Sequence, residues 1–94
     1  MENDLLIGQI VQSKAGRDKN RYFFVVGILD EQYVLVADGD LRLVESPKKK
    51  KKKHLAVTQY KDERLKKIIG EQKKVTNALL KRSINSLILS NKGD

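Results

Sequence analysis

The first part of the chain is organised as short apolar runs, and the second part as a longer segment with helical spacing. The apolar runs lie at residues 5–13, 21–29, 33–45 and 54–58. They are rich in β-branched and aromatic side chains and are short enough to favour strands over helices. A glycine inside each of the first two runs permits a bend or a bulge in the strand.

The segment "YVLVADGDLRLVE", residues 33–45, carries the clearest hairpin signal. Its apolar residues alternate on both sides of Asp38 and Gly39, which are residue types favoured in a type I′ turn. Pro47 ends the second strand of this hairpin, because proline cannot donate to a ladder. The four runs therefore predict five strands within about 58 residues, a pattern typical of a small curled barrel.

Apolar residues beyond the last run recur at spacings of three to five residues. This spacing predicts one or two amphipathic helices within residues 61–90. Gly70 costs about 1 kcal/mol in a helix interior and marks the expected break. We expect two units, a barrel over residues 1–58 that includes a lysine-rich loop at 48–53, and an amphipathic helical extension over 59–94.

The charge is unevenly distributed along the 94 residues. The chain carries 20 lysines and arginines against 12 aspartates and glutamates, a formal net charge of +8 at pH 7. Residues 1–47 hold five basic and eight acidic side chains, residues 48–53 are six lysines, and residues 54–94 hold nine basic and four acidic side chains. A basic balance of this size suits a polyanionic partner such as a nucleic acid.

Several kinds of chemistry have no residues to support them. The chain has no cysteine, so it lacks a disulfide framework, a thiolate nucleophile and a cysteine-based zinc site. Its one histidine, His54, has no companion at metal-ligand spacing, and its paired carboxylates come with neither a nucleophile nor a base. We therefore expect no cofactor, no bound metal, no small-molecule substrate and no enzymatic activity.

The sequence also carries no membrane or export signal. No run approaches the roughly 18 apolar residues of a membrane span. The segment "MENDLLIGQ" is acidic where a signal peptide is basic. We expect a cytoplasmic protein that does not bind membranes.

A polar, basic segment separates the first two predicted strands. It places four cations around Gly16, namely Lys14, Arg17, Lys19 and Arg21. A plain turn needs a glycine or an asparagine because these residues accept positive φ, but it does not need four cations. We interpret the loop as an RNA contact in which these side chains point toward phosphates, and Ser13 and the loop N–H groups add hydrogen bonds. The alternative is a solvated loop in which Asp18 pairs with Arg17 or Arg21.

The stretch "IGQIVQSKAGRDKNRYFFVVGI", followed by "YVLVADGDLRLVE", resembles a KOW motif, a strand, loop and strand built around one essential glycine, here Gly16. Over residues 6–58 the chain resembles the bacterial KOW-domain RNA-binding proteins related to the KOW-type large-subunit ribosomal proteins of archaea and eukaryotes. The resemblance implies a mainly β fold with added α-structure, an SH3-like barrel followed by the helical extension, and RNA binding, often in the ribosome. Asn20 stands where such loops commonly have a second glycine.

The second basic feature is an uninterrupted lysine run. It comprises Lys48, Lys49, Lys50, Lys51, Lys52 and Lys53. A block of like charge repels itself and is expected to be extended and mobile without a partner. We interpret it as an arm that orders along RNA, and the alternatives are a solubilising loop or a targeting-like patch.

These features together predict a non-catalytic RNA-binding protein that neutralises phosphates of structured RNA, and the resemblance indicates ribosomal RNA or the large ribosomal subunit. If six to eight phosphates are neutralised, the slope of log affinity against log salt is roughly −4 to −7. The free protein is expected to be a monomer. Two alternatives stay open, a transcription-associated KOW module that binds polymerase or a factor, and an adaptor that works through the basic amphipathic helix.

Overall fold

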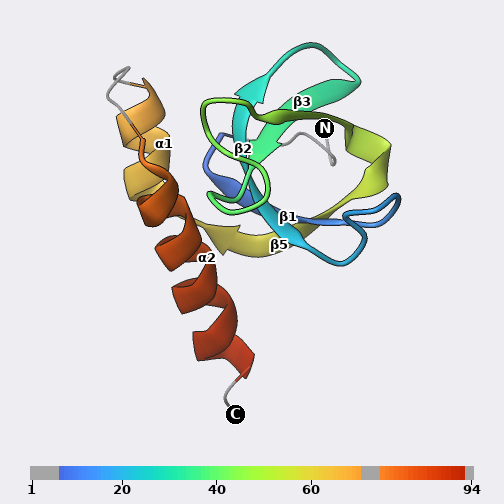
Figure 1. Ribbon diagram of the computed structural model, residues 1–94. Coiled ribbons are helices and arrows are strands. Elements are labelled where there is room, and N and C mark those ends of the chain that lie inside the picture. The colour runs from blue at the N-terminus through green and yellow to red at the C-terminus, as the bar shows by residue number, and fades with distance from the viewer. Residues whose placement is uncertain (1–6, 71–74, 93–94) are drawn as a thin grey trace.

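A computed structural model describes residues 7–70 and 75–92 of the chain. The elements follow in the order β1 (Gln9–Ser13), β2 (Tyr22–Ile28), β3 (Tyr33–Ala37), β4 (Lys48–Lys51), a 3₁₀ turn η1 (Lys52–His54), β5 (Leu55–Lys61), α1 (Glu63–Gly70) and α2 (Asn77–Lys92). The strands form one antiparallel sheet in the order β4-β3-β2-β1-β5, and the two helices lie along one side of it (Figure 1). The predicted mainly β fold with C-terminal helical structure is confirmed.

The sheet is curled, but it is not closed into the predicted barrel. In the described part of the chain β4 and β5 form the two edges and do not pair with each other. They are nevertheless joined by η1 alone, which has three residues. A flat sheet of this width would separate its edge strands by about 19 Å, whereas such a link spans at most about 14 Å. The short link therefore requires the sheet to curl and bring its edges toward each other.

The fourth strand is formed by lysines and not by the second half of the predicted hairpin. The Oδ1 atom of Asp38 accepts hydrogen bonds from the N–H groups of Asp40 and Arg42, each at 2.9 Å. These N–H groups would otherwise be available for the strand pairing of a type I′ hairpin. Because the Asp38 side chain binds them, the chain after β3 forms an irregular loop. Strand β3 pairs instead with β4, and Val34 lies opposite Lys50.

Both faces of the central strands are buried, which explains why β2 reads as a continuous apolar run. One core lies on the face that carries no helix and contains Val11, Phe23, Val25, Val34, Val36 and Leu55. The other core joins the sheet to the helices and contains Ile10, Phe24, Ala37, Leu65, Val75 and Leu80. Phe23 and Phe24 are both fully buried, and they belong to different cores. A register shift between Val25 and Gly27 interrupts the β2–β3 ladder.

The carboxylate of Asp62 attaches both helices to the end of β5. Its Oδ1 atom accepts hydrogen bonds from the N–H groups of Arg64 (3.0 Å) and Leu65 (3.3 Å), so it caps the start of α1. Its Oδ2 atom accepts a hydrogen bond of 2.5 Å from the hydroxyl group of Ser83 in α2. Helix α1 ends at Gly70, where the sequence predicts a break.

The N-terminus of α2 rests on the loop that follows β3. The Asn77 side chain accepts a hydrogen bond of 2.7 Å from the N–H group of Val44 and donates one of 2.9 Å to Glu45. Gly39, with a φ of +79°, lies so close to Asn77 that a Cβ atom on Gly39 would overlap the Asn77 carbonyl oxygen. The absence of a side chain at Gly39 therefore determines how closely α2 approaches the sheet.

Replacing Gly39 by alanine is expected to lower the free energy of unfolding more than replacing Gly16. The two glycines have φ values of +79° and +80°, so the strain of a left-handed L-residue, about 1–2 kcal/mol, applies to both. At Gly39 the new methyl group also displaces Asn77, whereas at Gly16 it meets only the Nζ atom of Lys50 at 3.9 Å. Urea unfolding of Gly39→Ala and Gly16→Ala measures the difference, and equal losses would contradict this packing of α2.

Candidate nucleic-acid interface

The loop between β1 and β2 is a tight turn built on two residues with positive φ. Gly16 has a φ of +80° and Asn20 a φ of +76°. The N–H group of Ser13 donates to the carbonyl of Arg21 at 2.9 Å, and that of Asn20 donates to the carbonyl of Ser13 at 2.8 Å. Asparagine tolerates the left-handed conformation, so Asn20 supplies this backbone geometry without a glycine.

Three of the loop cations are directed to solvent. Lys14, Arg17 and Lys19 are exposed, and they make no ion pair within residues 7–70 and 75–92. The backbone N–H group of Lys14 donates to the carbonyl of His54 at 2.8 Å, so η1 anchors the start of the loop. The structure thus brings three unpaired cations together on one anchored turn.

Ser13 does not face solvent as the sequence interpretation requires. It is 1% exposed, and its hydroxyl group donates to the carbonyl of Ala15 at 3.0 Å. The same oxygen accepts a hydrogen bond of 3.0 Å from the Nζ atom of Lys50. Ser13 therefore organises the loop from inside and has no free position for a phosphate contact.

Asp18 is buried beneath the loop, and its ionic partners differ from those expected. It is 4% exposed, and its Oδ2 atom lies 3.2 Å from Nη2 of Arg42 and 3.1 Å from Nζ of Lys48. Burial by itself would raise the pKa of Asp18, but the hydrogen bonds from Lys48 and Arg42 outweigh it and hold that pKa below its ordinary value. The sequence offered no local signal for Arg42, which pairs across 24 positions of the chain.

Arg21, the fourth loop cation, is engaged by acidic side chains. Its Nη2 atom lies 2.8 Å from Oδ2 of Asp38 and 3.8 Å from Oδ2 of Asp40. Burial would raise the pKa of Asp38, but the hydrogen bond from Arg21 and those from the loop N–H groups lower it below its ordinary value. Arg21 therefore ties the β1–β2 loop to the loop after β3.

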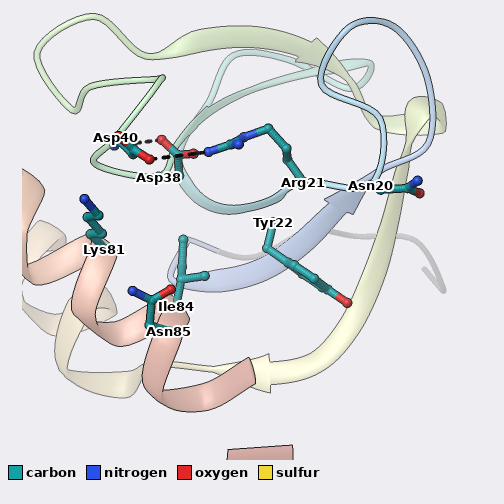
Figure 2. A pocket seen from close by; sticks show the side chains of 8 residues that line it. All are labelled: Asn20, Arg21, Tyr22, Asp38, Asp40, Lys81, Ile84 and Asn85. Carbon is teal, nitrogen blue, oxygen red and sulfur yellow. Dashed lines mark hydrogen bonds and ion pairs between the residues drawn. The ribbon is translucent and has the colours of Figure 1, made fainter. Parts of the chain in front are cut away.

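The cleft beside Arg21 carries charges of both signs. It has a volume of about 300 Å³ and is lined by Asn20, Arg21, Tyr22, Asp38, Asp40, Lys81, Ile84 and Asn85. Figure 2 shows Arg21 extended toward Asp38 and Asp40, with Lys81 of α2 on the helix side of the cleft. Two acidic and two basic side chains offset each other here, so the cleft presents no concentrated positive charge to a phosphate.

The lysine run is not a mobile arm or a loop, because its first four residues form the edge strand β4. Successive side chains of a strand point to opposite faces, so the run is divided. Lys49 and Lys51 flank the ring of Tyr33, with their Nζ atoms 4.4 Å and 5.8 Å from the ring centroid. Lys48 and Lys50 point to the other face, toward the β1–β2 loop.

The members of the run also differ in exposure. Lys49 and Lys53 are exposed, Lys48, Lys51 and Lys52 are half-buried, and Lys50 is only 8% exposed. Burial lowers the pKa of Lys50, the charge of Lys48 lowers it further, and the charge of Asp18 partly opposes both. Two of the six lysine side chains are therefore exposed to solvent.

The described residues contain neither a metal-binding cluster nor a helix suited to span a membrane. No group of three or more histidine, cysteine, aspartate or glutamate side chains among residues 7–70 and 75–92 is arranged to hold a metal ion. Neither helix in this part of the chain combines the length and the apolar character needed to cross a membrane.

Comparison with known proteins identified one clear relative. No known protein-family model matches the chain. Over 72 residues the chain is 38% identical to a protein of Bacillus subtilis (strain 168) that is named "Putative ribosome-binding protein YbzG". The aligned region covers 77% of this chain and 97% of the Bacillus protein, so the similarity extends over nearly the whole relative.

Replacing Asp18 by asparagine is expected to destabilise the protein near neutral pH by about 1–3 kcal/mol, because Arg42 and Lys48 lose their charged acceptor. The folded-state pKa of Asp18 lies below the unfolded value of 3.8. Its contribution to stability is therefore present above about pH 4 and is lost as the pH falls through the lowered pKa. Urea unfolding at pH 7, 4 and 3 should show a smaller acid-induced loss in Asp18→Asn than in the wild type.

The matched control for this change is Asp40→Asn, at an exposed carboxylate whose nearest cation is 3.8 Å away. It is expected to change the stability at pH 7 by less than about 0.5 kcal/mol. If Asp18→Asn behaved like this control, the ion pairs beneath the loop would not contribute to folding.

Proposed function

The chain belongs to the same family as this Bacillus subtilis protein, and we propose that it is a non-catalytic protein that associates with the ribosome. The observation that carries this proposal is a sequence similarity that extends over nearly the whole of a relative named for ribosome binding. The excess of basic side chains suits a partner whose surface is rich in phosphate. A protein with this role acts in the cytoplasm.

We further propose that the contact is made with ribosomal RNA and that it reads the RNA backbone. The exposed cations of the β1–β2 loop and of the lysine run are Lys14, Arg17, Lys19, Lys49 and Lys53. The planar guanidinium group of Arg17 matches two phosphate oxygens at once. Lys51 and Lys52 are half-buried and can add to the local charge. The half-buried Lys48 and Arg21 already have acidic partners, so we assign them to support of the loops and not to phosphate binding.

The placement of the aromatic side chains supports a backbone-reading mode over base stacking. Phe23 and Phe24 are fully buried, and Tyr22 and Tyr60 pack against the core beneath the helices. Tyr33 is half-buried and has the ammonium group of Lys49 over its ring. Single-stranded RNA readers stack bases on exposed aromatic faces, and none of these five rings offers a fully free one.

Sedimentation of a tagged copy through sucrose gradients of cell lysate tests the association. The protein is expected to migrate with large ribosomal subunits at low salt and to dissociate at high salt, because phosphate contacts weaken as counterions compete. Protein that stays at the top of the gradient under all conditions would contradict the proposal. A complex that survives both ribonuclease and high salt would point to a protein partner. In a separate experiment, flotation of the protein with anionic vesicles would point to a membrane adaptor.

Substitution of Arg17 and Lys19 by alanine is expected to weaken binding to purified large-subunit ribosomal RNA without changing the unfolding temperature. Each phosphate contact contributes about −0.7 to −0.9 to the slope of log affinity against log salt. Five exposed cations therefore predict a slope of about −4 for the wild type. The double variant loses two contacts, so its slope should be shallower by about 1.5. Filter binding over a series of salt concentrations measures both slopes.

The control variant Arg64→Ala/Lys67→Ala removes the same charges from exposed positions of α1. It is expected to leave the slope close to that of the wild type. Equal losses in the two double variants would mean that net charge alone drives binding and that the β1–β2 loop has no particular role.

A further inference from the structure

Lys50 carries a buried charge with no acidic group in direct contact. It is 8% exposed, and its Nζ atom donates to two neutral acceptors, the hydroxyl group of Ser13 at 3.0 Å and the carbonyl of Ala15 at 3.3 Å. The nearby carboxylate of Asp18 is bound by Lys48 instead. An ammonium group has three donors, so Lys50 retains one that the described residues do not use.

The space next to this ammonium group is open at Gly16. Gly16 is exposed, and a Cβ atom built on it would have only one heavy atom within 4 Å, the Nζ atom of Lys50 at 3.9 Å. An anion oxygen placed in this space could approach Nζ to the roughly 2.8 Å of a charge-assisted hydrogen bond. Because Gly16 has no side chain, an open gap lies between the solvent and the buried charge of Lys50.

The backbone of the same turn offers further donors. The N–H groups of Lys19, Asn20 and Arg21 are used inside the loop. Those of Gly16 and Arg17 have no acceptor among the described residues, and both residues are exposed. Successive N–H groups in a turn that includes a left-handed residue commonly form an anion-binding concavity.

Asn20 indicates that Gly16 does more than supply positive φ. Both residues lie in the same loop with nearly equal φ, +76° and +80°. The chain meets the backbone requirement at position 20 with a residue that has a side chain, but at position 16 it has none. A side chain at position 16 would fill the space in front of Lys50.

We propose that the gap beside Gly16 is a phosphate-binding site, in which Nζ of Lys50 and the N–H groups of Gly16 and Arg17 contact the phosphate oxygens. The exposed side chains of Lys14 and Lys19 surround it. This site deepens the proposed function and rests on it, because the phosphate is supplied by the RNA backbone. Removing an ammonium group from water is costly unless a counterion compensates it, and a bound phosphate provides that counterion.

Two-dimensional ¹H–¹⁵N NMR tests the site with inorganic phosphate and then with a short single-stranded RNA. The amide signals of Gly16 and Arg17 are expected to shift saturably with both. Lys50→Met should weaken phosphate binding at these amides by about tenfold or more. The control Lys67→Met removes an equal charge from an exposed position of α1, outside the proposed interface, and should change phosphate binding by less than about twofold.

Gly16→Asn provides a second test that leaves net charge and positive φ in place. Its side chain occupies the gap, so the phosphate-induced shifts should be lost while the unfolding temperature stays close to that of the wild type. Wild-type affinity in both Lys50→Met and Gly16→Asn would overturn the site. Shifts with inorganic phosphate but none with RNA would overturn the assignment of the phosphate to an RNA backbone.

Sucrose-gradient sedimentation, run in parallel, separates this inference from the proposed function. If the wild type migrates with ribosomes but Lys50→Met binds RNA as tightly as Lys67→Met, the phosphate site is wrong and the ribosomal role stands. If phosphate binds at Gly16 and the wild type never migrates with ribosomes, the ribosomal role is wrong.

Discussion

A single buried carboxylate organises the basic side of this protein. Asp18 receives Arg42 from the loop after β3 and Lys48 from β4, so it joins three segments that are distant in the sequence. Like charges on neighbouring segments repel each other, and the negative charge between them offsets this repulsion. With Lys48 held by Asp18, the alternation of β4 directs Lys50 beneath the β1–β2 loop, and that loop in turn presents its exposed cations.

The division of the lysine run shows that charge density in a sequence does not measure charge available for binding. Six adjacent lysines contribute equally to the net charge, but the strand separates the first four into two faces and its neighbours engage several of them. Long lysine stems can cover apolar surface while the ammonium group finds a polar partner. The same lysines also suit an edge strand, because their repulsion discourages another chain from pairing there.

The sequence predicts the parts of this fold that follow from local patterns. The short apolar run at residues 21–29 indicated the strand β2, and the spacing beyond β5 indicated amphipathic helices. The strand at Lys48–Lys51 could not be found in this way, because its residue types favour solvent and only the ladder with β3 holds them extended. The hairpin rule failed at Asp38, since it considers the turn residues and ignores the competing side-chain hydrogen bonds. The inward direction of Lys50 depends on the same unrecognised strand.

The link between β4 and β5 gives the chain itself a part in keeping the sheet curled. The two edge strands are not held to each other by ladder hydrogen bonds in the described residues, but η1 connects them directly. Separation of the edges is thus restricted by the contour length of three residues, a covalent restraint that neither salt nor pH weakens. The seam beside η1 can therefore carry lysines without opening, and a longer insertion there would let the two edge strands move apart.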